Sequence, residues 1–270
     1  MTLIVGFKCG DSVVLCADSQ ETRGNLKSEI NKLPIHMGDG GTDVVCAGAG
    51  NGELTDGFRA RLEAAIGPSQ ASDKEMIRRE IENALVEFHQ SPVFASFPGK
   101  DEDKYICGLI CVRTRTREVM LFKYFCSVVE SVDTYHLAGE DYAHFEHVVR
   151  RLFRTGTSVQ QAILMGLEVL NTAKATSLFV GGPTRVVVAT PSGISVENTR
   201  RINAAEAFVQ TKIEAFDSLS FDLGSSNVQM QKKVDAFANS ITSIRGIYGS
   251  KFESWPQSSF GEIEPSDDDS

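Results

Sequence analysis

The chain lacks the features that mark membrane, secreted or nucleic-acid-binding proteins. No apolar run approaches the about 18 residues of a transmembrane helix. The start, MTLIVGFKCGD, has neither the basic region nor the long apolar region of a signal peptide. The formal net charge is −9 and no stripe of Lys and Arg is present, which disfavours binding to phosphate backbones. We therefore expect no membrane span and no nucleic-acid partner.

Cysteine and histidine patterns that would hold a metal are also missing. The six cysteines lie within or at the end of apolar stretches, and the pair Cys107 and Cys111 has no second Cys or His pair at metal spacing. Among the five histidines, His144 and His147 lack the glutamate of an H-E-x-x-H motif. Free, buried cysteines fit a reducing cytoplasm. We expect a cytoplasmic protein with no metal and no cofactor.

Several catalytic motifs are absent as well. The glycines do not form G-x-G-x-x-G after a strand, and no Gly-Lys-Ser/Thr of a P-loop occurs, so a nucleotide-binding fold is disfavoured. No G-x-S-x-G sequence is present, and no conventional catalytic triad is visible.

The hydrophobic pattern predicts strands and helices that are segregated along the chain. Runs rich in Val, Ile and Leu predict strands, and apolar residues three and four apart predict helices. The predicted strands are 2–8, 12–17, 32–37, 44–47, 105–113, 118–125, 127–132, 185–189 and 194–197, and the predicted helices are 53–66, 73–89, 141–153 and 158–173. Segregated strands and helices favour an α+β fold with two sheets stacked between helix layers.

The C-terminal part of the chain has a different composition. Residues 204–216 and 228–244 predict two further helices, and the closing residues are rich in Asp, Glu and Ser. We therefore expect a main domain over 1–200, a helical extension over 201–250, and an acidic, disordered tail over 251–270.

The chemistry of the N-terminus suggests a nucleophile that needs no histidine. An α-amino group has a pKa of about 7.7–8.0, which suits a general base, and a threonine hydroxyl can be activated by its own amine. Such a site needs a cation near the hydroxyl and a carboxylate that pairs with that cation. Thr2, once Met1 is removed, supplies the nucleophile, and Lys32 and Asp18 supply the charges. Taken singly, Asp18 could cap a turn and Lys32 could lie on the surface.

The sequence around these residues resembles proteasome β-type subunits. The resemblance is carried by residues 2–8, 13–19 and 22–25, by Lys32 at the head of a strand, and by 46–50, Cys-Ala-Gly-Ala-Gly. A weaker similarity over 105–112, 158–170 and 181–182 extends it to about residue 200. It implies an N-terminal-nucleophile (Ntn) hydrolase fold, a four-layer αββα sandwich. The added C-terminal residues suggest a divergent bacterial relative, closer to the ancestral-β-subunit-like group.

The resemblance also implies roles for individual residues. Thr2 would attack a peptide carbonyl, with Lys32 and Asp18 as the ion pair beside it. Thr22, Gly48 and Gly50 would bind the substrate main chain as an added strand, and the N–H of Gly48 would stabilise the oxyanion. Cys46 would lie at the base of a specificity pocket. The implied substrate is a peptide or unfolded protein, and the implied assembly is a homo-oligomeric ring, with or without an unfoldase partner.

The sequence departs from the family pattern where the amine should be held. The positions that carry an Asp and a Ser in the family align with Ser177 and Val180, and a family serine at the start of the third helix aligns with Ala138. Ser177 alone could supply the missing contact. Three functions therefore stay open: a threonine-type peptidase, a catalytically silent ring or scaffold subunit, and an acylase that uses the same nucleophile on a small amide.

Overall fold

The computed structural model describes residues 2–23, 26–98, 100, 104–139 and 142–221. The chain divides into two compact units, Met1–Gln210 and Thr211–Ser270, and the fold below is that of the first. The domain boundaries expected from the sequence stay predictions. The predicted helix over 228–244 and the predicted acidic tail over 251–270 lie outside the described residues.

The first sheet is built around the N-terminal hairpin. Its order is β10-β1-β2-β11-β12, with every neighbouring pair antiparallel. The strands are β1 (Leu3–Cys9), β2 (Ser12–Ala17), β10 (Tyr135–Gly139), β11 (Arg185–Thr190) and β12 (Gly193–Val196). The predicted β1–β2 hairpin is confirmed, and Gly10 turns it with a φ of +57°.

The second sheet contains the strands from the middle of the chain. Its order is β5-β6-β7-β8-β9, again antiparallel throughout. The strands are β5 (Ile35–Met37), β6 (Asp43–Gly50), β7 (Ile106–Arg113), β8 (Val119–Phe125) and β9 (Val128–Ser131). A separate two-stranded hairpin is formed by β3 (Gln20–Arg23) and β4 (Leu26–Glu29).

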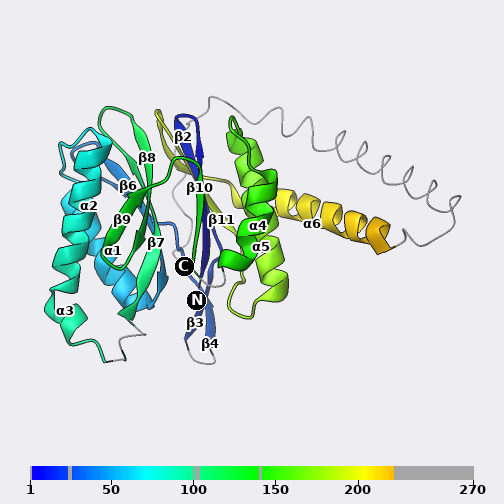
Figure 1. Cartoon of the computed structure of the whole chain (residues 1–270), viewed down its shortest axis with the longest axis horizontal. Helices are drawn as coiled ribbons and strands as arrows, with labels where there is room; N and C mark the ends of the chain where they lie inside the picture. The colour runs from blue at the N-terminus through cyan, green and yellow to red at the C-terminus, as the bar shows by residue number, and fades with distance from the viewer. Residues whose placement is uncertain (1, 24–25, 99, 101–103, 140–141, 222–270) are drawn as a thin grey trace, which may run out of the picture. The chain divides into compact units, whose positions relative to one another are not determined.

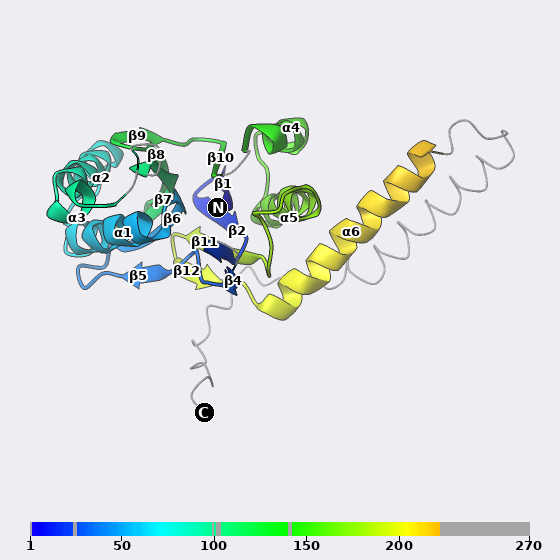
Figure 2. The same ribbon diagram turned by 90° about the horizontal axis from the view of Figure 1, so that it is seen from below.

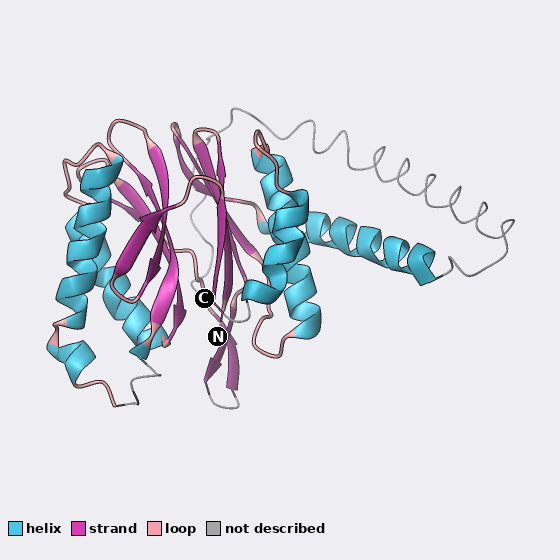
Figure 3. Cartoon of the chain, in the orientation of Figure 1, coloured by secondary structure: helices cyan, strands magenta, loops and turns pink. Residues whose placement is uncertain are grey.

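Helices cover the outer faces of the two sheets (Figures 1, 2 and 3). The helices are α1 (Gly52–Ile66), α2 (Lys74–His89), α3 (Pro92–Ala95), α4 (Tyr142–Leu152), α5 (Val159–Thr176) and α6 (Thr199–Phe221). Helices α1 and α2 lie on the second sheet, whereas α4 and α5 lie on the first. The α+β class with antiparallel sheets is therefore confirmed.

Two apolar clusters explain this arrangement. One lies between the second sheet and helices α1 and α2, and includes Phe58, Phe88 and Phe122. The other lies between the two sheets, where Leu15 and Leu109 are almost fully buried. Strands of the inner layers are buried on both faces, so they are apolar runs rather than alternating patterns.

The polar stretch before Lys32 contains the β3–β4 hairpin, for which the sequence made no prediction, because strand β4 is exposed along its whole length and lacks an apolar pattern. Two predictions about local structure were wrong. Lys32 does not head a strand, because β5 begins at Ile35. The segment ending at Gly139 is strand β10, not the start of a helix, because it completes the edge of the first sheet beside β1.

The cysteines are free in the structure. Cys9, Cys16, Cys46 and Cys111 are buried, and Cys107 is partly exposed. None of the helices in the described part of the chain combines the length and apolar character that a bilayer crossing needs.

Candidate active site

Asp18 is the centre of a buried polar cluster at the end of β2. The residue has no exposed surface. Its Oδ2 accepts hydrogen bonds from the N–H groups of Gln20 (3.2 Å) and Gly181 (3.2 Å), and its Oδ1 accepts one from the N–H of Leu3 (3.1 Å). These backbone donors satisfy the oxygens of a carboxylate that water cannot reach. Asp18 therefore ties the start of β1 and the segment before β11 to the end of β2.

Lys32 pairs with this carboxylate. Its ammonium donates to both oxygens of Asp18 at 3.0 Å, and it also donates to the carbonyl of Gln20. The two side chains are 4% and 0% exposed, so solvent screens their attraction little. Burial lowers the pKa of Lys32 below its usual value, and the charge of Asp18 opposes that effect. The ammonium thus lies in a site where a proton is lost more easily than from a surface lysine.

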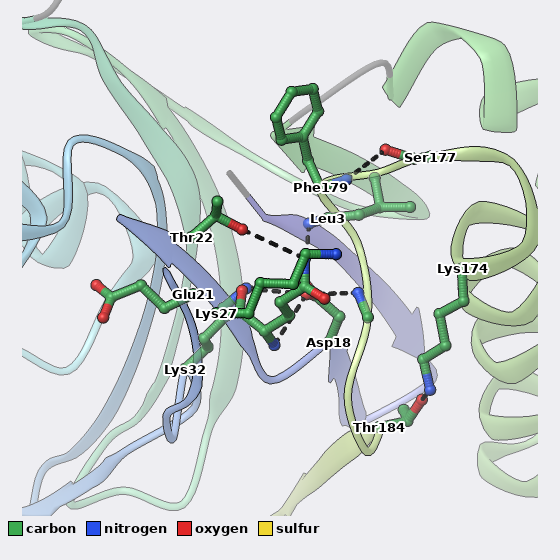
Figure 4. Close-up of polar contacts among 12 residues, drawn as sticks. Leu3, Asp18, Glu21, Thr22, Lys27, Lys32, Lys174, Ser177, Phe179 and Thr184 are labelled. Carbon is green, nitrogen blue, oxygen red and sulfur yellow. Dashed lines mark hydrogen bonds and ion pairs between the residues drawn. The ribbon is translucent and has the colours of Figure 1, made fainter. Parts of the chain in front are cut away.

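Thr2 lies directly beside this pair. It precedes β1 and is 7% exposed, and the adjacent Leu3 N–H and Lys32 Nζ share one oxygen of Asp18 (Figure 4). On its other side, the carbonyl of Thr2 is so close to Gly139 that a Cβ there would overlap it. Thr2, Asp18 and Lys32 are therefore brought together, although Thr2 and Lys32 are far apart in the sequence.

The glycine-rich end of β6 approaches the same place. The methyl group of Ala49 lies beside Gly139, which adjoins the Thr2 carbonyl. Strand β5 pairs with β6 only as far as Val45, so within the described residues Cys46–Gly50 have a strand neighbour, β7, on one side alone. This end of β6 presents an open edge next to Thr2.

Packing requires both glycines of this edge. A Cβ at Gly48 would overlap the methyl group of Thr55 on α1, and Gly50 has a φ of +112° with the carbonyl of Tyr105 against it. Packing and backbone conformation therefore explain why both positions are glycine, independent of any ligand.

The two other predicted binding residues differ in exposure. Thr22 lies on β3, partly exposed, and its hydroxyl accepts a hydrogen bond from Gln20 Nε2 (3.3 Å). Cys46 is 1% exposed in the apolar cluster beneath α1, and burial raises the pKa of its thiol to about 12. Cys46 is therefore a protonated, apolar part of the wall under the β6 edge.

The residues at the altered positions have other contacts. The hydroxyl of Ser177 accepts from the N–H of Phe179 (3.2 Å), in the turn that follows α5. Val180 is buried, and the methyl group of Ala138 belongs to the cluster between the sheets.

Solved structures with this fold are known. No protein-family model matches the chain. Anbu (ancestral beta-subunit) from Yersinia bercovieri superimposes with a TM-score of 0.66 at 15% identity, covering 84% of this chain and 99% of its own. Anbu from Hyphomicrobium sp. strain MC1 gives a TM-score of 0.60, and its Gly-1 mutant gives 0.64; both are 16% identical and cover 80% of this chain and 97% of their own. The chain has the fold of the Anbu proteins.

This result corrects the family resemblance inferred from the sequence. The structures that the chain matches are Anbu proteins, and identities of 15% and 16% establish a shared fold without membership of an enzyme family. The assignment of the chain to the proteasome β-subunit-like Ntn hydrolases was therefore wrong. The segments quoted for it agree with the elements of the Anbu-like fold but do not establish descent or activity.

Sequence reasoning missed two glycines that shape the site in this Anbu-like fold. Gly181 donates to Asp18 and accepts, through its carbonyl, from the N–H groups of Ser19 (3.2 Å) and Gln20 (3.0 Å). Gly139 makes room for the Thr2 carbonyl. The Gly-Gly pair at 181–182 was noted from the sequence only as part of the weaker family similarity, with no role at the site, and Gly139 was expected at the start of a helix.

No group of three or more His, Cys, Asp or Glu side chains in the described part of the chain gathers as a metal site would require. The side chains around Thr2 offer a carboxylate, an ammonium and a hydroxyl, which suit acid–base and nucleophilic chemistry.

Proposed function

We propose that the protein is a threonine-type amide hydrolase that acts as a peptidase, with Thr2 as nucleophile after removal of Met1. One observation carries the proposal: the buried carboxylate of Asp18 holds both the ammonium of Lys32 and the N–H of Leu3, next to Thr2. A buried ion pair adds little stability by itself, so its place beside a hydroxyl at the chain start favours a catalytic role.

The proposed reaction has two steps. The hydroxyl oxygen of Thr2 attacks the amide carbonyl carbon while the free α-amine takes its proton, and that proton is then given to the leaving nitrogen. The C–N bond breaks and an ester to Thr2 forms. Water then attacks the ester, again losing a proton to the amine, and releases the carboxylic acid and the free hydroxyl.

Lys32 stabilises the negative charge that develops on the Thr2 oxygen in this scheme. Its ammonium is preorganised because Asp18 and the Gln20 carbonyl hold it, so no rearrangement is needed during the reaction. Asp18 keeps the ammonium charged against the effect of burial, which lowers the pKa of Lys32.

The open edge of β6 supports a peptide as the substrate. An extended peptide can add to a strand that lacks a neighbour, with its main chain bonded to the strand. Gly48 and Gly50 would supply main-chain groups from β6, and Thr22 would supply them from β3, with the Gly48 N–H serving as oxyanion donor. Cys46 would form the apolar floor below this edge.

The proposal also includes a four-layer fold, a ring assembly and a cellular location. The helix, sheet, sheet, helix order is consistent with a four-layer αββα sandwich. The matched Anbu proteins are named as β-subunits, which supports a homo-oligomeric ring for this chain. The free cysteines favour a cytoplasmic location for the protein. The proposal holds with or without an unfoldase partner.

The test is a set of Thr2 variants assayed on fluorogenic peptides and on small amides. Thr2→Ala should reduce turnover by roughly a thousandfold or more, since it removes the nucleophile, whereas Thr2→Ser, which keeps a hydroxyl, should stay measurably active. Intact-mass measurement should show that Met1 is absent. Full activity of Thr2→Ala, or a retained Met1 in an active enzyme, would disprove the proposal.

A catalytically silent subunit is the second candidate. The observation in its favour is that the hydroxyl of Ser177 is bonded to the Phe179 N–H, and Ala138 offers no polar group. Covalent labelling of Thr2 by an epoxyketone probe would exclude a silent subunit, and turnover of small amides but not peptides would instead favour an acylase.

A further inference from the structure

The start of helix α6, as far as Gln210, belongs to the first unit and is packed within it. Asn198 caps the helix by accepting from the N–H of Arg200 (2.9 Å), and Ile202, Ala205 and Val209 form a buried stripe. Burial of this stripe fixes the rotation of the helix, so that Glu206, which follows Ala205, points toward Lys174 at the end of α5.

Glu206 joins two points that flank one loop. Its carboxylate accepts from Lys174 Nζ at 2.8 Å and from the hydroxyl of Thr184, and Lys174 also donates to that hydroxyl at 2.8 Å. Thr184 is 2% exposed, and the side chains of Lys174 and Glu206 are 20% and 18% exposed. Lys174 lies in the last turn of α5 and Thr184 immediately before β11 (Figure 4). These three side chains therefore hold together the two ends of the segment 177–184, which we call the 177–184 loop.

The 177–184 loop in turn holds the candidate site. Gly181 donates to Asp18 and accepts from the N–H groups of Ser19 and Gln20. The carbonyl of Leu178 accepts from Gln20 Nε2 (3.2 Å) and Lys27 Nζ (3.4 Å), which ties the loop to the β3–β4 hairpin. Hydrogen bonds at Thr184 and at Gly181, which are three residues apart in this loop, thus connect α6 with the Asp18 carboxylate through the loop backbone.

We propose that Glu206 is a positioning residue: through Lys174 and Thr184 it fixes the 177–184 loop, and through Gly181 it fixes Asp18 beside Thr2. The inference rests on the proposed function for its catalytic consequence only. The mechanical part, from Glu206 to Asp18, depends on the contacts alone. In this view the helix that follows the last strand of the sheet is part of the active-site scaffold.

The test compares Glu206→Gln with Glu82→Gln in the full chain. Glu82 is a matched control because, like Glu206, it pairs with a basic side chain, here that of Arg78, but it lies on α2. Hydrogen exchange should become on the order of tenfold faster at Gly181 and Leu3 in Glu206→Gln, because the negative charge that strengthens both hydrogen bonds at residue 206 is lost. Amides in the β6–β7 pair serve as the internal reference for global stability.

Activity gives the second measurement. Glu206→Gln should lower kcat for peptides by about tenfold at a temperature well below its melting transition, and Glu206→Asp, which keeps the carboxylate, should restore part of the loss. The control should change neither quantity. Exchange at Gly181 and Leu3 that matches the control would overturn the proposal. An inactive wild type would disprove the proposed function, while the exchange comparison would still decide the positioning role.

Discussion

Among single residues, Gly139 lies against the main-chain carbonyl of the candidate nucleophile, Thr2. It has a φ of +108°, and its α-carbon faces the carbonyl of Thr2 and the methyl group of Ala49. Asp18 holds the other side of the same peptide bond through Leu3. The position of Thr2 is therefore set by a steric limit on one side and a hydrogen bond on the other.

Replacement of Gly139 by alanine should destabilise the protein and move Thr2. The added methyl group would overlap the Thr2 carbonyl, and the positive φ is itself unfavourable. We expect a loss of about 3 kcal/mol or more, together with loss of hydrolase activity. Urea denaturation and peptide turnover measure the two effects.

Gly10→Ala is the matched control for this prediction. Gly10 also has a positive φ, +57°, but a methyl group there would have no atom within 4 Å. Its cost should therefore be limited to about 1–2 kcal/mol, with activity unchanged. Equal costs for the two variants would show that contact with Thr2 is unimportant.

Among secondary-structure elements, α1 follows the open edge of β6 without a loop. Asn51 links the two, because its side chain accepts from the N–H groups of Glu53 (3.0 Å) and Leu54 (3.3 Å) and so caps the helix. The cap fixes the direction in which the chain leaves Gly50. Loss of this cap should therefore alter the conformation of the β6 edge, where the substrate would bind.

Asn51→Ala should lower stability and activity together. Loss of an N-cap costs about 1 kcal/mol. Asp73→Ala is the matched control. The carboxylate of Asp73 caps α2 by accepting from the N–H of Met76 (2.9 Å), so its loss should cost a similar amount of stability, but at a place away from β6. We expect equal shifts in the denaturation midpoint and a rise in KM for peptides in Asn51→Ala alone. The same KM in both variants would argue against the β6 edge as the substrate site.

The same elements show what the sequence could and could not predict. The β1–β2 hairpin and the ends of α1 and α2 were predictable because turns, caps and apolar spacing are local signals. The contact between Gly181 and Asp18 spans 163 positions, and no local pattern encodes it. Strand β10 was missed because its partner β1 lies at the other end of the domain, and a strand this short carries little periodicity.

For the whole molecule, segregated strands and helices predicted the class of fold but not its strand order. The first sheet joins strands from the start, middle and end of the domain. This joining brings Thr2, Asp18 and the 177–184 loop into contact, so the candidate site depends on the complete sheet. Thr2, Asp18 and Lys32 could be proposed from residue chemistry, whereas Gly139, Gly181 and Glu206 needed the folded chain.

Self-association is the prediction at this scale. The net charge of −9 gives like molecules a repulsion that salt screens, so association through apolar surfaces should strengthen as salt is raised. Exposed apolar side chains such as Tyr105, Phe125 and Val128 are available for such contacts. Sedimentation velocity of the full chain at low and high salt should give species at multiples of the chain mass, more of them at high salt. A monomer under both conditions would refute the ring, while leaving the Thr2 chemistry to be judged by the Thr2→Ala assay.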